Sequence, residues 1–181
     1  MAEYEINSEA FYRRLERIQT HWAAHPELWG EADAICIPFG ASSEDAGYNK
    51  HISTYLYLLG WEFPETVMVL VRDTFFFLSS AKKCTIMQAA VSAGASRINV
   101  QILTRNKEDN NRENFTRILD AVKRAGTKIG YPMKEEFGGS FIASWIAAVD
   151  QQGLTKVDIA SGLSGALSVK EADELVSVAC S

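Results

Sequence analysis

Residues 66–79 read Thr-Val-Met-Val-Leu-Val-Arg-Asp-Thr-Phe-Phe-Phe-Leu-Ser, so two runs rich in β-branched and aromatic side chains are separated only by Arg72-Asp73. Two such runs joined by two residues are typical of an antiparallel β-hairpin. We expect its strands at 66–71 and 74–78. Arg-Asp is not a favoured hairpin turn pair, so the pattern leaves the register of the two strands open.

The segments that follow the hairpin predict a helix and a further strand. Residues 81–93 have the character of a helix that Gly94 ends, because glycine is common just after a helix. Ile98, Val100 and Ile102 then alternate with polar residues, as the side chains of a strand do.

Helical and strand-like segments alternate through the rest of the chain. We expect a first helix capped by Asn7 or Ser8 and closed by Pro26, and a helix at 140–150 capped by Ser140. The other expected elements are strands at 32–39, 127–130 and 154–159 and helices at 48–59, 110–125 and 171–179. This order predicts an α/β fold with a mixed β-sheet flanked by helices.

Size and composition fit one compact intracellular domain. The chain has 181 residues, of which 47% are hydrophobic and 23% charged, which excludes a disordered or collagen-like protein. The three cysteines, Cys36, Cys84 and Cys180, are odd in number and widely spaced, which favours a reducing compartment over a disulfide framework. No apolar run approaches the length of a membrane span, so no membrane partner is expected.

Charge is unevenly distributed along the chain. The formal net charge is −5, and residues 27–73 hold two basic and eight acidic side chains. A protein that follows phosphates normally has a basic domain, so no direct specific nucleic-acid binding is expected. The acidic segment permits a basic partner, although acidic surfaces also serve solubility.

The candidate catalytic and metal-binding residues each have a structural explanation. His21 and His25 have the i, i+4 spacing of helical zinc ligands, but no third ligand is apparent. Cys36 and Cys84 could each pair with His51 as a nucleophile. However, Cys36 lies between two isoleucines of an expected strand, which indicates a buried structural thiol.

Glycine motifs and carboxylate pairs do not add a catalytic group. Residues 162–165, Gly-Leu-Ser-Gly, lack the residue that a nucleophile elbow needs between serine and the second glycine. The carboxylate pairs Glu44-Asp45 and Glu135-Glu136 fall in expected loops, where we treat them as solvated charge. We therefore predict no catalytic residue, no metal site and no cofactor.

Short motifs spread over nearly the whole chain, in order and at compatible spacing, resemble one family. They include Phe-Tyr-Arg-Arg-Leu-Glu-Arg at 11–17, Leu-Leu-Gly-Trp-Glu-Phe-Pro at 58–64, Leu-Ser-Ser-Ala-Lys at 78–82, Lys-Ile-Gly at 128–130 and Val-Lys-Glu at 169–171. Together they resemble the large subunit of FACT, a nuclear histone chaperone complex, and the cluster at 61–64 resembles its fungal members.

This resemblance implies a fold and a domain organisation. The N-terminal region of that family is similar to the pita-bread aminopeptidases and creatinases, in which a smaller α/β lobe precedes a larger lobe. The resemblance therefore implies an aminopeptidase-P-like N-terminal lobe at 1–168 and the start of a connecting helix at 169–181, leading to a larger lobe outside this chain. It also implies that the metal ligands of the enzymes, which belong to the larger lobe, are lost in the chaperone, so that the protein is not an enzyme.

The resemblance further implies a noncatalytic protein-binding module that acts in the nucleus, on the chromosome. Such a module would contribute to histone binding and nucleosome reorganisation during transcription, DNA replication and DNA repair. Its partners would be core histones and, through domains outside this chain, the smaller FACT subunit. The candidate contact residues are Tyr48, Lys50, Trp61, Glu62 and Phe63.

Two alternatives remain open. Trp61, Phe63 and Pro64 could simply pack the turn between a helix and a strand, because aromatic clusters more often belong to a core. The chain could also be the N-terminal substrate-shaping lobe of a metal-dependent aminopeptidase or creatinase. A downstream set of Asp, His and Glu ligands would favour that enzyme, since its metal needs such a shell.

Overall fold

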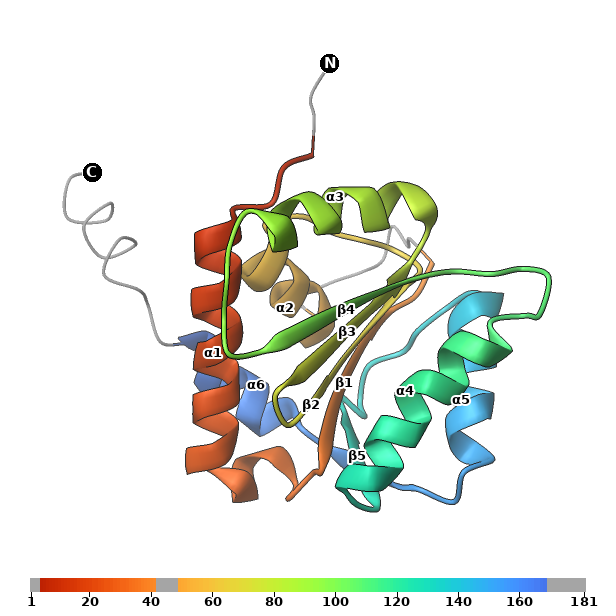
Figure 1. Ribbon diagram of the computed structural model, residues 1–181. Helices are drawn as coiled ribbons and strands as arrows, with labels where there is room; N and C mark the ends of the chain where they lie inside the picture. Colours follow the sequence, from red (N-terminus) through yellow and green to blue (C-terminus); the bar gives the residue numbers. More distant parts are fainter. Residues whose placement is uncertain (1–3, 42–48, 169–181) are drawn as a thin grey trace.

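The computed structural model describes residues 4–41 and 49–168, which form one six-stranded sheet with helices on both faces (Figure 1). The strand order is β4-β3-β2-β1-β5-β6. The strands are β1 (Ala34–Phe39), β2 (Thr66–Val71), β3 (Thr74–Ser79), β4 (Asn99–Thr104), β5 (Lys128–Tyr131) and β6 (Thr155–Asp158).

The sheet is mixed, as the sequence predicted. Strand β2 runs antiparallel to both of its neighbours, whereas the β3–β4, β1–β5 and β5–β6 pairs are parallel. The expected hairpin is confirmed, and its register pairs Val71 with Thr74 across the two-residue turn. Arg72 closes this turn in the left-handed region, with φ 53°, a conformation that costs a non-glycine residue free energy.

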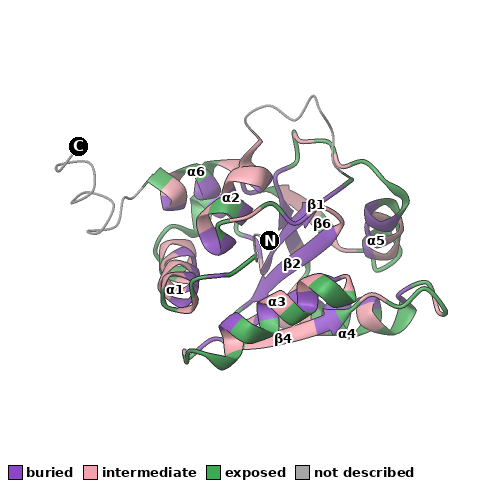
Figure 2. Ribbon diagram, turned by 90° about the horizontal axis from the view of Figure 1, so that it is seen from above, coloured by how far each residue is buried: buried purple, intermediate pink, exposed green. Residues whose placement is uncertain are grey.

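Within the described residues, four α-helices cover one face of the sheet and two cover the other (Figures 1 and 2). On the first face lie α1 (Ser8–Ala24), α2 (Lys50–Leu59), α3 (Ala81–Ser92) and α6 (Ala160–Ser168), with the short 3-10 helix η1 (Pro26–Trp29) after α1. On the second face lie α4 (Arg112–Ala125) and α5 (Ser140–Asp150).

Each face has its own hydrophobic core because successive strand residues point to opposite sides. In β2, Met68 and Leu70 join the core under α1 and α2, while Val67 and Val69 join the core under α4 and α5. All six residues of β2 are buried, so the strand reads as a continuous apolar run in the sequence.

Several expected element boundaries need correction. The helix expected at 48–59 begins at Lys50 within the described residues, and the helix expected at 171–179 lies outside them. The prediction that Ser140 caps α5 is wrong: the N-cap residue is Gly139, with φ 94°, and no side chain caps this end. Asn7 is the cap of α1, accepting a hydrogen bond from the backbone N–H of Ala10.

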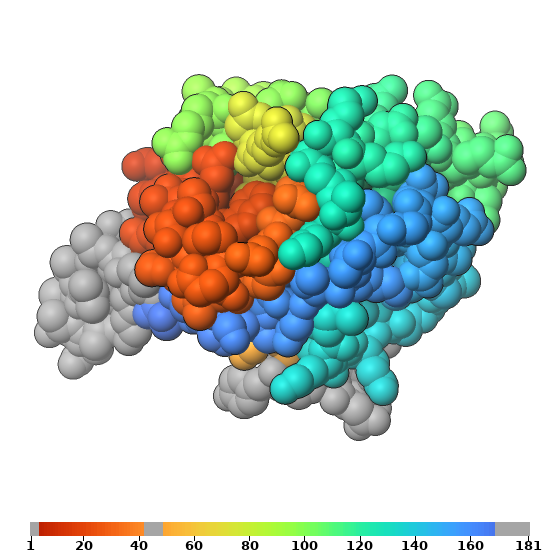
Figure 3. All heavy atoms as spheres, turned by 90° about the horizontal axis from the view of Figure 1, so that it is seen from below, coloured from red at the N-terminus to blue at the C-terminus, as the bar shows by residue number. Residues whose placement is uncertain are grey.

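Helix α6 was not predicted, and it contains the Gly-Leu-Ser-Gly motif. Figure 3 shows its blue residues beside the orange residues of the first helical segments. A Cβ atom on Gly162 would lie only 2.2 Å from Cδ2 of Trp29, and one on Gly165 would lie 2.8 Å from Nε2 of His21. The motif is therefore a helix-packing contact, which agrees with the prediction that it is not a nucleophile elbow.

None of the helices within the described ranges combines the length and the apolar character that a bilayer span needs.

Candidate functional site

The expected contact residues do not form one continuous patch. Tyr48 lies outside the described residues, Lys50 is the first residue of α2, and Trp61, Glu62 and Phe63 follow its C-terminal end. Ten helical residues rise by about 15 Å, so the two groups lie at opposite ends of the helix. We therefore describe the two ends of α2 separately.

The N-terminal end of α2 is held by Glu135, from the loop between β5 and α5. Its carboxylate accepts hydrogen bonds from the backbone N–H groups of Lys50 and His51, both at 2.9 Å. The same carboxylate lies 2.5 Å from Nδ1 of His51. A carboxylate at this position satisfies N–H groups that have no partner within the helix and complements the positive end of the helix dipole.

The surroundings of His51 are aromatic and nearly closed to solvent. The side chain of His51 is 6% exposed and that of Glu135 is 11% exposed. The rings of Phe39 and Phe137 pack edge-on against the imidazole at 5.1 Å and 4.9 Å between centroids. Thr54, one turn along α2, is also buried and bonds back to the carbonyl of Lys50.

Glu135 is therefore not the solvated charge that the sequence suggested. Burial by itself would raise the pKa of this carboxyl. The hydrogen bonds from the His51 side chain and from the backbone of His51 and Lys50 outweigh burial, so the pKa lies below its ordinary value. Adjacent Glu136 is exposed, so of the pair Glu135-Glu136 only Glu136 is the solvated charge that the sequence predicted.

The C-terminal end of α2 contains one buried aromatic residue and one that is partly open. Phe63 is 2% exposed and packs against Phe77 of β3, so this candidate contact residue belongs to the core. Trp61 is half-buried: its indole N–H donates to the carbonyl of Glu5 at 2.9 Å, and Tyr4 packs against its ring at 4.8 Å. Tyr4 is 51% exposed, so this aromatic pair, with exposed Glu62 beside it, can be reached from solvent.

Three described carboxylates of the acidic segment 27–73, those of Glu31, Asp33 and Glu65, have local partners. Glu31 lies 3.8 Å from the ammonium of Lys128, and Glu65 lies 3.5 Å from the guanidinium of Arg105. Asp33 accepts hydrogen bonds from the backbone at the start of β5. These three carboxylates therefore contribute to local structure.

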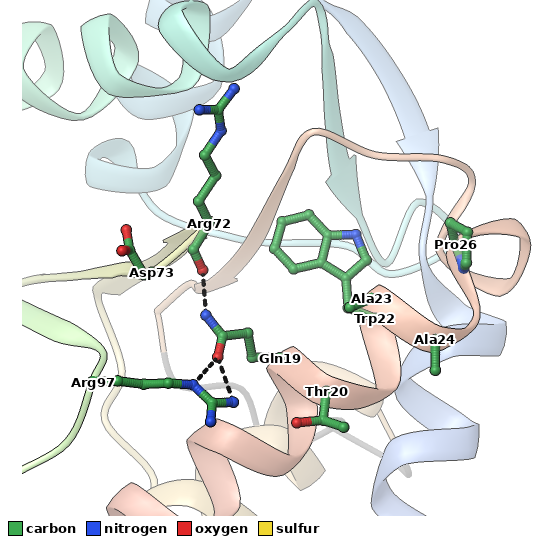
Figure 4. Close-up of a pocket in the computed structure, with 9 residues that line it drawn as sticks. All are labelled: Gln19, Thr20, Trp22, Ala23, Ala24, Pro26, Arg72, Asp73 and Arg97. Atoms are coloured by element: carbon green, nitrogen blue, oxygen red, sulfur yellow. Dashed lines mark hydrogen bonds between the residues drawn. The ribbon is translucent and has the colours of Figure 1, made fainter.

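An open groove of about 960 Å³ lies at the C-terminal end of α1 (Figure 4). In Figure 4, Trp22 and Pro26 lie on one side and the hairpin turn with Arg97 on the other. Gln19 joins the two sides, because it donates to the carbonyl of Arg72 at 2.8 Å and accepts from Arg97 at 3.0 Å. No motif marks this groove, since three separate segments form it.

The described residues do not assemble a nucleophile or a metal site. Cys36 is fully buried, and burial raises the pKa of its thiol to about 12, which keeps it protonated and agrees with a structural role. Nδ1 of His21 accepts a hydrogen bond from the indole of Trp29 at 3.0 Å, so this nitrogen is already used in packing. Nowhere in 4–41 or 49–168 do three His, Cys, Asp or Glu side chains gather as metal ligands would.

Solved structures place this architecture in a known class. Aminopeptidase P from Streptococcus thermophilus superposes with a TM-score of 0.53 at 14% identity, over 87% of this chain and 98% of that chain. At this identity the likeness concerns the fold alone, and it confirms an aminopeptidase-P-like α/β lobe.

Sequence comparison identifies the family within that class. Residues 6–162 match the family model described as the FACT complex subunit SPT16 N-terminal lobe domain. The chain therefore belongs to the SPT16 N-terminal lobe family. The N-terminal domain of SPT16 from Eremothecium gossypii superposes with a TM-score of 0.85 at 26% identity, over 96% of this chain and 40% of that chain.

Curated relatives are named as FACT complex subunits. FACT complex subunit ctc-2 of Neurospora crassa is 34% identical over 183 residues, which cover 97% of this chain and 17% of that protein. FACT complex subunit SPT16 of Dictyostelium discoideum is 30% identical over 177 residues, which cover 95% of this chain and 16% of that protein. The chain thus spans about one sixth of the length of these relatives.

Proposed function

We propose that this lobe is a noncatalytic protein-binding module of the large FACT subunit. In this role it contributes to histone binding and nucleosome reorganisation during transcription, replication and repair, in the nucleus on the chromosome. The observation that carries the proposal is the family match over residues 6–162. Residues 1–168 form the lobe, and 169–181 begin a connecting helix to a larger lobe. The smaller FACT subunit is contacted through domains outside this chain.

The exposed surface at the C-terminal end of α2 supports a protein partner. Tyr4 and Trp61 offer an accessible aromatic pair, and aromatic residues are enriched at the centres of protein interfaces. Glu62 is exposed next to them and can meet a basic side chain. The contact surface at this end of α2 therefore comprises Tyr4, Trp61 and Glu62, with Phe63 packing beneath it. Lys50, at the other end of α2, is a separate candidate contact residue.

The test is a salt titration of the purified chain against core histones. Binding should be detectable at low ionic strength and weaken as salt is added, because exposed charge pairs are screened. Glu62→Lys should weaken binding by about two- to fivefold, the effect of one exposed charge pair. Glu27→Lys makes the same charge change on η1, away from α2, and serves as the matched control.

The possible outcomes distinguish the proposal that the lobe binds histones from the proposal that it does so through the end of α2. Absence of binding at low salt overturns the histone-binding proposal. Equal losses for Glu62→Lys and Glu27→Lys leave the module in place and overturn the assignment of its surface to the end of α2.

The aminopeptidase alternative predicts metal ligands in the lobe that would follow residue 181. The fold likeness to aminopeptidase P favours it only at the level of architecture. Sequencing beyond residue 181 decides the question, since a hydrolase needs a shell of Asp, His and Glu ligands there. A larger lobe without these ligands supports the noncatalytic module.

A further inference from the structure

Strand β4 forms one edge of the sheet, and its outer side has free backbone groups. The backbone N–H groups of Asn99 and Arg105 donate to carbonyl oxygens on the β3 side, at 2.7 Å and 2.8 Å. The backbone N–H and C=O groups of successive residues point to alternate sides of a strand. In β4, those of the odd-numbered residues point toward β3 and those of the even-numbered residues point outward. The N–H and C=O groups of Val100 and Ile102 therefore point away from the sheet.

The outward row ends where a helix begins to cover it. The carbonyl of Thr104 accepts a hydrogen bond from the side-chain amide of Asn114 in α4, at 2.8 Å. Among the described residues, β3 is the one strand that pairs with β4. The open part of the edge is thus centred on Val100 and Ile102.

This edge lacks the features that usually prevent strand addition. Natural edge strands are protected by lysine, proline, a bulge or short length. Strand β4 reads Asn-Val-Gln-Ile-Leu-Thr, with no charge and no proline, and it pairs with β3 without interruption from Thr74↔Asn99 to Ser79↔Thr104. The opposite edge strand, β6, is only four residues long and carries Lys156 and Asp158.

Helices α3 and α4 lie beside this edge (Figure 2), and both carry more basic than acidic side chains. Helix α3 carries Lys82 and Lys83 and no acidic residue, while α4 carries four basic and two acidic side chains. Arg97 and Arg105 flank β4 at its two ends, where Arg97 lies 3.8 Å from Glu16 and Arg105 lies 3.5 Å from Glu65. A second copy of this chain would bring the same basic elements together, so charge disfavours pairing between two copies.

We propose that the β4 edge binds an extended segment of a partner protein that carries acidic side chains, added to the sheet as a seventh strand. The backbone of Val100 and Ile102 supplies the hydrogen bonds, as in other cases of strand addition. Apolar side chains of the added strand extend the core beside Val100 and Ile102, and its acidic side chains meet the basic side chains of the neighbouring helices α3 and α4. This partner differs in charge from a histone, so the inference is independent of the proposed function.

A defined peptide tests the proposal on the purified chain. The probe is a fluorescein-labelled peptide of alternating valine and threonine with glutamates at both ends, and the same peptide with lysines at both ends is its control. Val100→Pro removes an outward N–H and leaves the β3–β4 hydrogen bonds intact, and proline is tolerated at such edge positions. Val100→Thr keeps the N–H and is the matched variant.

The proposal expects the glutamate peptide to bind more tightly than the lysine peptide. It expects Val100→Pro to weaken binding by about tenfold, the effect of losing one hydrogen bond, and Val100→Thr to leave it nearly unchanged. In the wild-type chain, bound peptide should slow amide exchange at Val100 and Ile102. No protection at these amides, or equal binding of the two peptides, overturns the proposal. Protection that appears without peptide as protein concentration rises identifies a second copy as the occupant and also overturns it.

Discussion

The carboxylate of Glu135 lies 2.5 Å from the imidazole Nδ1 of His51, although 84 residues separate them in the chain. Glu135 also accepts hydrogen bonds from the backbone N–H groups of Lys50 and His51. Together these three contacts hold the loop before α5 against the start of α2. Both side chains are largely shielded from solvent, and a hydrogen bond to a charged carboxylate in a low local dielectric is stronger electrostatically than one in water.

Replacing this carboxylate should loosen the start of α2. Glu135→Gln keeps an acceptor oxygen but removes the negative charge of the carboxylate to which the two N–H groups and the imidazole are hydrogen-bonded. We expect the free energy of unfolding to fall by about 1–2 kcal/mol, the typical difference for hydrogen bonds to a charged group. Urea unfolding followed by tryptophan fluorescence measures this change.

Glu136→Gln is the matched control, since its neighbouring side chain is exposed. We expect a change within about 0.5 kcal/mol. Equal effects of the two substitutions would contradict a structural role for Glu135.

The free energy of unfolding should fall on acidification, because the Glu135 carboxylate becomes protonated. The pKa of Glu135 is lower in the folded protein than the ordinary value of a glutamate carboxyl, so between the folded and the unfolded pKa the unfolded chain binds more protons. The stabilisation is therefore complete above the unfolded pKa and is lost as pH falls through the folded pKa. The difference in unfolding free energy between wild type and Glu135→Gln should shrink as pH falls below about 5. A difference that stays constant over this range contradicts the assignment.

Close packing at Gly162 should make this position intolerant of a side chain. A Cβ there would lie 2.2 Å from the ring of Trp29, which is fully buried and cannot move away easily. We expect Gly162→Ala to destabilise the protein by about 1–3 kcal/mol through overpacking, although alanine favours helices. Thermal unfolding measures this loss. Ser164→Ala, on the exposed side of the same helix, should be neutral or slightly stabilising, and a neutral Gly162→Ala would contradict the packing.

The buried thiols should not react in the folded state. Burial raises the pKa of Cys36 to about 12, and it also raises the pKa of Cys84, so little thiolate is present near neutral pH. In a Cys180→Ser variant, which removes the cysteine outside the described residues, Ellman's reagent should find almost no fast-reacting thiol. Both remaining thiols should react after unfolding. Rapid reaction of the folded variant would contradict their burial.

Local patterns predicted the parts of the fold that depend on local interactions. The hairpin, α1, α3, α5 and β4, expected at 97–103 and found at Asn99–Thr104, follow mainly from side-chain periodicity, with Asn7 as the cap of α1. Helix α6 was missed because Gly162 and Gly165 argue locally against a helix, whereas their contacts with Trp29 and His21 require small residues there.

The candidate site was predicted less well for the same reason. The motif at 58–64 contains Trp61 and Phe63 only two positions apart, but one ring is half-buried beside Tyr4 and the other lies in the core. The pairing of Glu135 with His51 left no local signal, because nothing in a loop sequence shows which distant helix it meets.

The sequence by itself determined the α/β class, the hairpin that runs through the middle of the sheet and, through its ordered motifs, the family. Tertiary structure alone decided which carboxylate is buried, which aromatic side chains remain accessible and which strand is left at an open edge. The physical reason is that secondary structure and motifs depend on neighbours along the chain. Burial, charge pairing and edge position depend instead on segments that only folding brings together.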